Sequence, residues 1–216
     1  MKFNLKKLAT VVAAVVVSAT AMAQFSVNLG YLNDARSNTT TLGENSRTSK
    51  SSFNGFTVGA AYTLNFTEMF GLNAGLNYQF LNNHEDIDVF GTETDINTTI
   101  HALDIPVRFE VGYNFTDALR VFGYVGPKFV FDLSGKTKTK ISTAIGEGNS
   151  ESQDMFKDTD YSRFNLMLGP GVGVKFNALS LRLGYDLGLL NRYTGEANDN
   201  FKIRNNQFYV TLGYSF

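Results

Sequence analysis

Strict alternation of apolar and polar residues is the feature of this sequence that most limits its fold. Between residues 103 and 113, for example, every odd position is Leu, Ile, Val, Phe or Tyr, and the even positions hold Asp, Pro, Arg, Glu and Gly. A period of two indicates a β-strand with one apolar face. The pattern recurs in eight stretches, at residues 25–31, 56–66, 70–80, 103–113, 119–132, 163–176, 179–189 and 207–216.

These stretches have the properties of strands that cross a membrane. With flanking residues we expect roughly nine to thirteen residues each, enough to span a bilayer at a tilt of about 45°, whereas soluble strands average about five to six. No apolar-face position is charged, and the opposite face combines charged residues with twelve of the 20 glycines. Glycine weakens a solvent-exposed strand, but it makes room for large neighbours inside a narrow barrel. The sequence therefore predicts an all-β fold, an eight-stranded antiparallel up-and-down transmembrane β-barrel.

The connections between these stretches alternate in length, which fits the same fold. Residues 67–69, 114–118 and 177–178 form short turns, while residues 34–52, 81–99, 134–160 and 191–203 are predicted to be long polar loops. Outer-membrane barrels have short periplasmic turns and long extracellular loops. The alternative is a secreted soluble β-sandwich or lipocalin-like barrel, whose apolar face would point inward and whose strands would be shorter.

The first 23 residues have the three parts of a cleaved secretory signal peptide. Lys2, Lys6 and Lys7 form a basic start, residues 8–17 are mostly apolar, and residues 21–23 read Ala-Met-Ala. An apolar run of about ten residues spans about half of a bilayer core, so a membrane anchor is the weaker interpretation. We therefore expect residues 1–23 to be the signal and residues 24–216 to be the barrel domain.

Charged residues on the polar faces are expected to meet inside the barrel. A charge buried alone costs several kcal/mol, so these side chains must pair or be hydrated. We expect a structural network that fills the lumen, with a narrow, anion-leaning solute path as the alternative. The predicted network consists of Asp104, Arg108, Glu110, Arg120, Lys128, Asp132, Arg163, Lys175, Arg182 and Asp186.

Two further clusters carry weaker hypotheses, both in predicted loops. His84, Glu85, Asp86 and Asp88, with His101 at the far edge of the same loop, offer metal ligands or a base for a hydrolase, but acidic loops are more often simply solvated. Lys136, Lys138 and Lys140 form an alternating basic run that either is solvated or contacts anionic lipid headgroups or a ligand. The absence of Cys excludes thiolate chemistry, and a net charge of −1 gives no indication of a nucleic-acid partner. We expect no catalytic, cofactor-binding or metal-binding residue.

Two short motifs resemble a known family, and the end of the chain resembles an assembly signal. The segment Leu-Asp-Ile-Pro-Val-Arg-Phe at 103–109 resembles the L-(E/D)-I-P strand of the Bacteroidetes-type outer membrane β-barrel domain family, which includes PorT-like proteins. The segment Tyr-Val-Gly-Pro-Lys at 124–128 is similar to the strand that follows in that family, although its spacing differs there. The end of the chain, with Tyr214 and Phe216, resembles the signal that the barrel-assembly machinery reads.

The resemblance implies an outer-membrane location and a barrel fold, but no catalytic or binding residue. Together with the residue patterns, it favours a non-enzymatic outer-membrane protein with a filled lumen and extracellular loops that bind or shield. The alternatives are a small porin or a PorT-like channel associated with transport or secretion, and then an outer-membrane hydrolase. The expected partners are outer-membrane lipid, the barrel-assembly machinery and an extracellular ligand that the sequence does not identify.

Overall fold

The structure is a computed structural model that describes residues 23–89, 92–143, 146–147, 151–157, 159–196 and 200–216. The predicted signal peptide lies outside the described residues except for Ala23, the first residue of β1. Among the described residues, no helix is long and apolar enough to cross a membrane. The strands are β1 (Ala23–Leu42), β2 (Asn45–Asn65), β3 (Phe70–Val89), β4 (Thr92–Asn114), β5 (Leu119–Thr143), β6 (Gly146–Glu147), β7 (Glu151–Asp154), β8 (Phe164–Phe176), β9 (Leu179–Gly188) and β10 (Phe201–Ser215).

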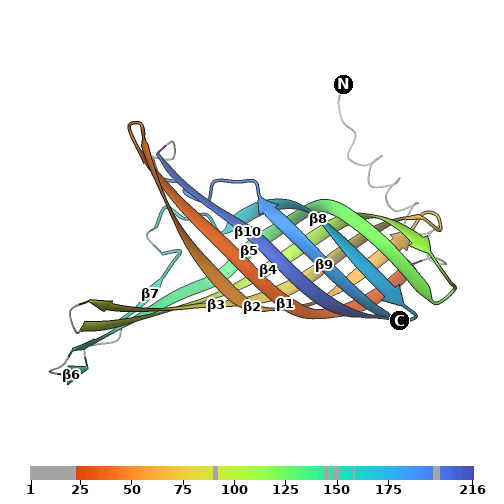
Figure 1. The fold of residues 1–216 in the computed structure, drawn as a ribbon, viewed down its shortest axis with the longest axis horizontal. Coiled ribbons are helices and arrows are strands. Elements are labelled where there is room, and N and C mark those ends of the chain that lie inside the picture. The colour runs from red at the N-terminus through yellow and green to blue at the C-terminus, as the bar shows by residue number, and fades with distance from the viewer. Residues whose placement is uncertain (1–22, 90–91, 144–145, 148–150, 158, 197–199) are drawn as a thin grey trace.

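Eight of the described strands close into an antiparallel barrel (Figure 1). Each strand from β1 to β5 pairs with the next, β5 pairs with β8, and β8 to β10 follow in order. The ring closes where β10 pairs with β1, from Ser26 opposite Ser215 to Thr40 opposite Phe201. The short strands β6 and β7 pair with the outer part of β5 and lie outside the ring. The predicted fold is therefore confirmed.

The two ends of the barrel differ as the sequence predicts. Short turns join β2 to β3, β4 to β5 and β8 to β9 at the end where the C-terminus lies (Figure 1). Asn177, in the turn between β8 and β9, has a φ of 51°, a left-handed conformation that asparagine tolerates better than most residues. Short turns mark the periplasmic end of an outer-membrane barrel, so the opposite end faces outward.

The prediction of long polar loops at the outward end is largely wrong, because most of those residues form strands. The hairpin β1–β2 is paired up to Leu42 opposite Asn45, and β3–β4 up to Val89 opposite Thr92. Polar side chains bond across these extensions: the hydroxyls of Thr39 and Thr48 lie 3.0 Å apart. Both faces are polar there, so the alternation that marks the lower strands disappears although the pairing continues. In Figure 1 the β1–β2 hairpin and the β3–β4–β5 sheet project in different directions.

The two faces of the barrel wall separate apolar from polar side chains. Apolar residues that point away from the lumen remain exposed, such as Leu29, Val172 and Leu212 at 59–66%. Buried residues in the lumen are mostly polar or charged, with two small apolar clusters in the outward half. One cluster contains Leu32, Phe53, Leu81 and Ile100, and the other contains Ala102, Val130 and Met167. An apolar exterior around a polar lumen is the reverse of a soluble barrel and fits a lipid environment.

Inward glycines make room for aromatic rings in the lumen. Phe122 and Tyr124 interrupt the polar face of β5 in the sequence, and both are buried inside the barrel. A side chain at Gly171 would overlap the Tyr124 ring, and one at Gly173 would overlap the Phe122 ring. The glycines of β8 therefore set the shape of the lumen rather than leaving it open.

This packing predicts that Gly171→Val is destabilising, whereas Gly123→Val is tolerated. Gly123 lies opposite Val172 in the β5–β8 register, and a Cβ added there meets nothing nearer than 3.9 Å. Overpacking a filled interior costs about 1–3 kcal/mol. The free energy of unfolding of both variants in phospholipid vesicles tests this, and equal values would show that the lumen has spare room.

Candidate functional site

The centre of the lumen is crossed by an ion-pair cluster around Asp186 of β9. Asp186 is fully buried, and Arg108 of β4 donates to both of its carboxylate oxygens at 2.7 and 2.8 Å. Lys128 of β5 lies 2.6 Å from the same carboxylate and donates to the Gln207 side chain at 2.6 Å. Strand β9 is thus joined across the interior to the neighbouring strands β4 and β5.

Amide side chains extend this cluster toward the outward end. Asp104 accepts hydrogen bonds from Gln79 at 2.5 Å and from Asn77 at 2.8 Å. Gln207 donates to Gln79 and to Asp34, the latter at 2.8 Å. Asp34 also pairs with Arg36 at 3.0 Å. Buried charges are tolerable only when paired and hydrogen-bonded, and this connected set meets that condition.

Three cations line the periplasmic half of the lumen. Arg182 pairs with Glu110 at 2.7 Å, and its guanidinium lies 4.8 Å from the centre of the Phe122 ring. Lys175 donates to the Gln24 side chain. Arg120 donates to the backbone carbonyls of residues 68 and 69 in the turn between β2 and β3. The cations in excess over acids therefore bind amide and carbonyl oxygens.

The outward end of the lumen is closed by residues that the sequence analysis missed. Arg192, which follows β9, is buried and pairs with Asp132 at 2.5 Å. The guanidinium of Arg192 lies 4.4 Å from the centre of the Tyr161 ring. Burial raises the pKa of the Tyr161 hydroxyl, so it stays neutral beside these charges. Asp34 and Arg36 continue the series of alternate β1 residues that face the lumen, so the sequence pattern could have identified them. Arg192 lies in an irregular segment, where no alternation indicates its direction.

Nine of the ten predicted network residues lie along the lumen or at its periplasmic mouth, and Arg163 does not. Arg163 is exposed at the outward rim, where it donates to the Leu133 carbonyl at 2.7 Å and lies over the Phe156 ring. The prediction for Arg163 is wrong because β8 begins only at Phe164, so strand parity no longer directs the side chain inward.

Two spaces inside the described barrel meet at Arg182, which lines both. A cavity of about 70 Å³ lies at mid-height between Asn73, Asp104, Arg108 and Tyr209, a volume with room for only a few water molecules. A wider vestibule of about 430 Å³ opens at the short-turn end and reaches Glu110 and Arg182. The ion pairs of Asp186 and the two apolar clusters lie between the vestibule and the outward end.

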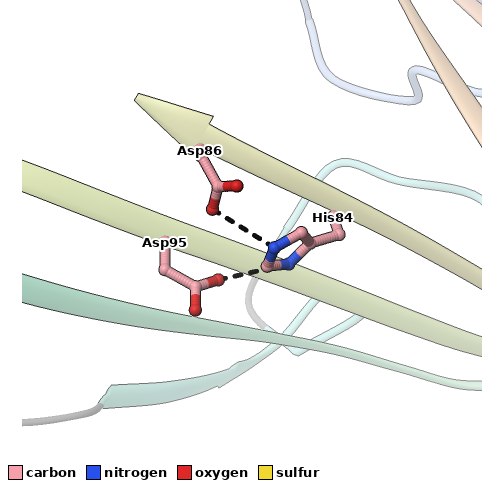
Figure 2. Close-up of side chains that lie close together, drawn as sticks. All are labelled: His84, Asp86 and Asp95. Atoms are coloured by element: carbon pink, nitrogen blue, oxygen red, sulfur yellow. Dashed lines mark ion pairs between the residues drawn. The ribbon is translucent and has the colours of Figure 1, made fainter. Parts of the chain in front are cut away.

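The His84 cluster lies on the projecting β3–β4 hairpin (Figure 2). Its Nε2 is 3.2 Å from Asp86 and its Nδ1 is 3.3 Å from Asp95, and the three ligand atoms lie within 4.8 Å of one another. Each ring nitrogen faces a different carboxylate, so the imidazole bridges two acids. Metal ligation would require one nitrogen to share an ion with both carboxylates. Asp86 lies directly opposite Asp95 in the register, and the His84 ring lies between the two carboxylates.

His101 lies at the upper edge of the lipid-facing wall. Its Nδ1 is 2.5 Å from the Tyr78 hydroxyl, and its ring packs edge-on against Phe80. Among the described side chains, no hydrogen bond joins a serine hydroxyl to either histidine. Ser134 lies opposite His101 in the β4–β5 register.

A closed ring of strands with an apolar exterior and a charged, cross-linked lumen defines the class of integral outer-membrane β-barrels. The chain belongs to the outer membrane protein β-barrel domain family, whose model matches residues 17–193. The protein therefore resides in the outer membrane. No curated protein sequence matches the chain.

Several solved structures are similar to the chain at low sequence identity. Ail, the attachment invasion locus protein of Yersinia pestis, in complex with the heparin analogue sucrose octasulfate, is 16% identical over 90% of this chain and 99% of its own, with a TM-score of 0.37. Neisserial surface protein A is 14% identical over 90% and 99%, with a TM-score of 0.40. The outer membrane protease OmpT of Escherichia coli is 12% identical over 90% and 96%, with a TM-score of 0.47.

Proposed function

We propose that this protein is a non-enzymatic outer-membrane barrel that does not conduct solutes and that carries a binding surface on its outward strands. The observation that supports a closed lumen is the Asp186 cluster, in which Arg108 and Lys128 reach one carboxylate from two other strands. An eight-stranded barrel has an interior just wide enough for side chains to fill. The projecting β1–β2 hairpin and β3–β4–β5 sheet then provide the surface available to extracellular partners.

The closed lumen predicts that the purified protein gives no steady single-channel current in a planar bilayer. A porin reconstituted in parallel checks that the bilayer reports open channels. Long-lived steps in the wild-type protein that change in Arg108→Ala but not in Arg163→Ala would contradict the proposal. That outcome would favour the alternative of a small porin or a PorT-like channel associated with transport or secretion, for which the periplasmic vestibule is the supporting feature.

The export and assembly of the chain are part of the same proposal. Residues 1–23 are removed as a signal peptide, so the mature protein begins at Gln24, whose side chain accepts a hydrogen bond from Lys175. The barrel-assembly machinery recognises the terminal strand with Tyr214 and Phe216. The Phe216 ring packs edge-on against Tyr214, and its backbone N–H donates to the Phe25 carbonyl at 2.9 Å. Mass spectrometry of the exported protein measures the mature N-terminus.

A further inference from the structure

A groove on the outer surface of the barrel joins the lipid-facing wall to a row of lysines. It has a volume of about 550 Å³ and lies on the face of β4 and β5 that points away from the lumen. Its lining includes His101 and Ser134 at the lower end and Lys136, Lys138 and Lys140 above them. All three lysines are exposed.

A β-bulge directs these lysines outward. Below the bulge the even-numbered residues of β5, such as Lys128 and Asp132, point into the lumen. The register shifts between His101 and Ala102: Ala102 lies opposite Asp132, whereas His101 lies opposite Ser134, so Leu133 is the extra residue. From Ser134 on, the even-numbered residues of β5 face away from the lumen. Bulges commonly re-aim side chains beside functional sites, and without this one the three lysines would point into the barrel.

The lysines lie just above the apolar surface that meets lipid. Leu133 is 49% exposed and is the last apolar residue on the outward face of β5 before them. At about 3.3 Å per residue and a tilt of about 40°, Lys136 is about 8 Å farther along the membrane normal, and each further lysine adds about 5 Å. The headgroup layer is about 5–7 Å thick on each side of the bilayer. A lysine side chain extends about 6 Å from its Cα, so Lys136 and Lys138 reach back to this layer, whereas Lys140 lies above it.

We propose that the groove binds a phosphate-bearing headgroup of an outer-leaflet lipid. The side chains that line the groove carry three positive charges and one negative charge, that of Asp95, which lies opposite Lys140. A second negative charge, that of Asp154, lies opposite Lys136, and its carboxylate also accepts the backbone N–H of Phe156 at 2.9 Å. Lys138 is flanked by the neutral Asn97 and Ser152. A lipid with its acyl chains against the wall below presents its phosphates at this height.

The test compares two triple variants of the full barrel that lose the same charge. The site variant is Lys136→Gln, Lys138→Gln and Lys140→Gln, and the control is Arg47→Gln, Lys50→Gln and Lys202→Gln on the outward parts of β2 and β10. The probe is fluorescent diphosphoryl lipid A in nonionic detergent micelles, with phosphatidylethanolamine as the comparison lipid. At about 1 kcal/mol for each of the two lysines that reach the headgroup, the site variant should bind lipid A about thirtyfold more weakly. The control should change binding less than threefold.

Two results would overturn the proposal. One is wild-type affinity for lipid A in the site variant, with folding checked by the mobility shift of unheated protein on gels. The other is displacement of lipid A by inorganic phosphate at equal concentration, which would make the groove a site for small anions rather than for lipid. The inference rests on the outer-membrane location and on the outward direction of the lysines. It is therefore independent of the conductance measurement, and either proposal can fail alone.

Discussion

Replacing Asp186 with alanine should destabilise the barrel by about 3–5 kcal/mol, because breaking a buried ion pair leaves uncompensated charge. Two cations depend on this one carboxylate, since Arg108 and Lys128 both contact it. Asp186 has no exposed surface, so solvent cannot replace the lost partner without entering the lumen. We expect this to be among the most damaging single substitutions in the lumen.

The measurement is a denaturant titration of the protein in phospholipid vesicles. Circular dichroism or gel mobility reports folding, because the chain has no tryptophan. Asp186→Asn separates charge from volume: it preserves the size of the side chain but removes the charge, and it should cost nearly as much as alanine. Asp117→Ala, in an exposed periplasmic turn, is the matched control and should stay within about 0.5 kcal/mol of the wild type.

A wild-type stability for Asp186→Asn would contradict the electrostatic argument. The cluster would then act through packing, and the charges of Arg108 and Lys128 would be solvated by water or by the neighbouring carbonyl and amide oxygens. Arg108 already donates to the backbone carbonyls of Gly126 and Gly169, and Lys128 to Gln207. A second test adds Arg108→Met and Lys128→Met to the Asp186→Asn variant. If the cluster acts through packing, these two substitutions change the stability little. If it acts through ion pairs, they restore part of the stability that Asp186→Asn removed.

The sequence predicts the barrel well because one signal, period two, is tied directly to the two environments of a strand. The side chain at each position must meet either lipid or the lumen, so parity alone places Leu183 outside and Asp186 inside. The same rule explains why Phe122 and Tyr124, which interrupt the polar face, still lie inward. Their rings fit because glycines of β8 lie next to them. Such a contact between two strands cannot be read from the alternation within one strand.

The remaining features depend on contacts between distant segments. The bulge at Leu133 reverses parity for Lys136 and the residues after it, and nothing in the local sequence marks it. Arg192 reaches Asp132 from an irregular segment, so no period predicts the pairing. The outward strands were predicted as loops because a strand that is solvated on both faces has no apolar alternation. Arg163 shows the opposite error, since strand parity was applied to the residue before β8 begins.

Replacing Leu183 with arginine tests which surface of the wall meets lipid. Leu183 lies near the middle of β9, is 45% exposed on the outside, and is opposite Val172 and Val210 on the neighbouring strands. An arginine at mid-bilayer on the lipid face costs about 2–4 kcal/mol, falling to about 0–1 kcal/mol near the interfaces. We therefore expect Leu183→Arg to lower the free energy of unfolding in vesicles by about 2–4 kcal/mol.

The depth dependence supplies the control, because it separates a lipid effect from a general intolerance of arginine on β9. Leu179 begins the same strand at the periplasmic end and faces the same way, with 61% exposure. Leu179→Arg should therefore cost at most about 1 kcal/mol, since its guanidinium reaches the headgroups. Equal costs at both positions would mean that no apolar lipid layer surrounds Leu183. In detergent micelles, which lack a fixed bilayer thickness, the difference between the two variants should shrink. Persistence of the full difference there would point to protein packing at Leu183 instead of lipid.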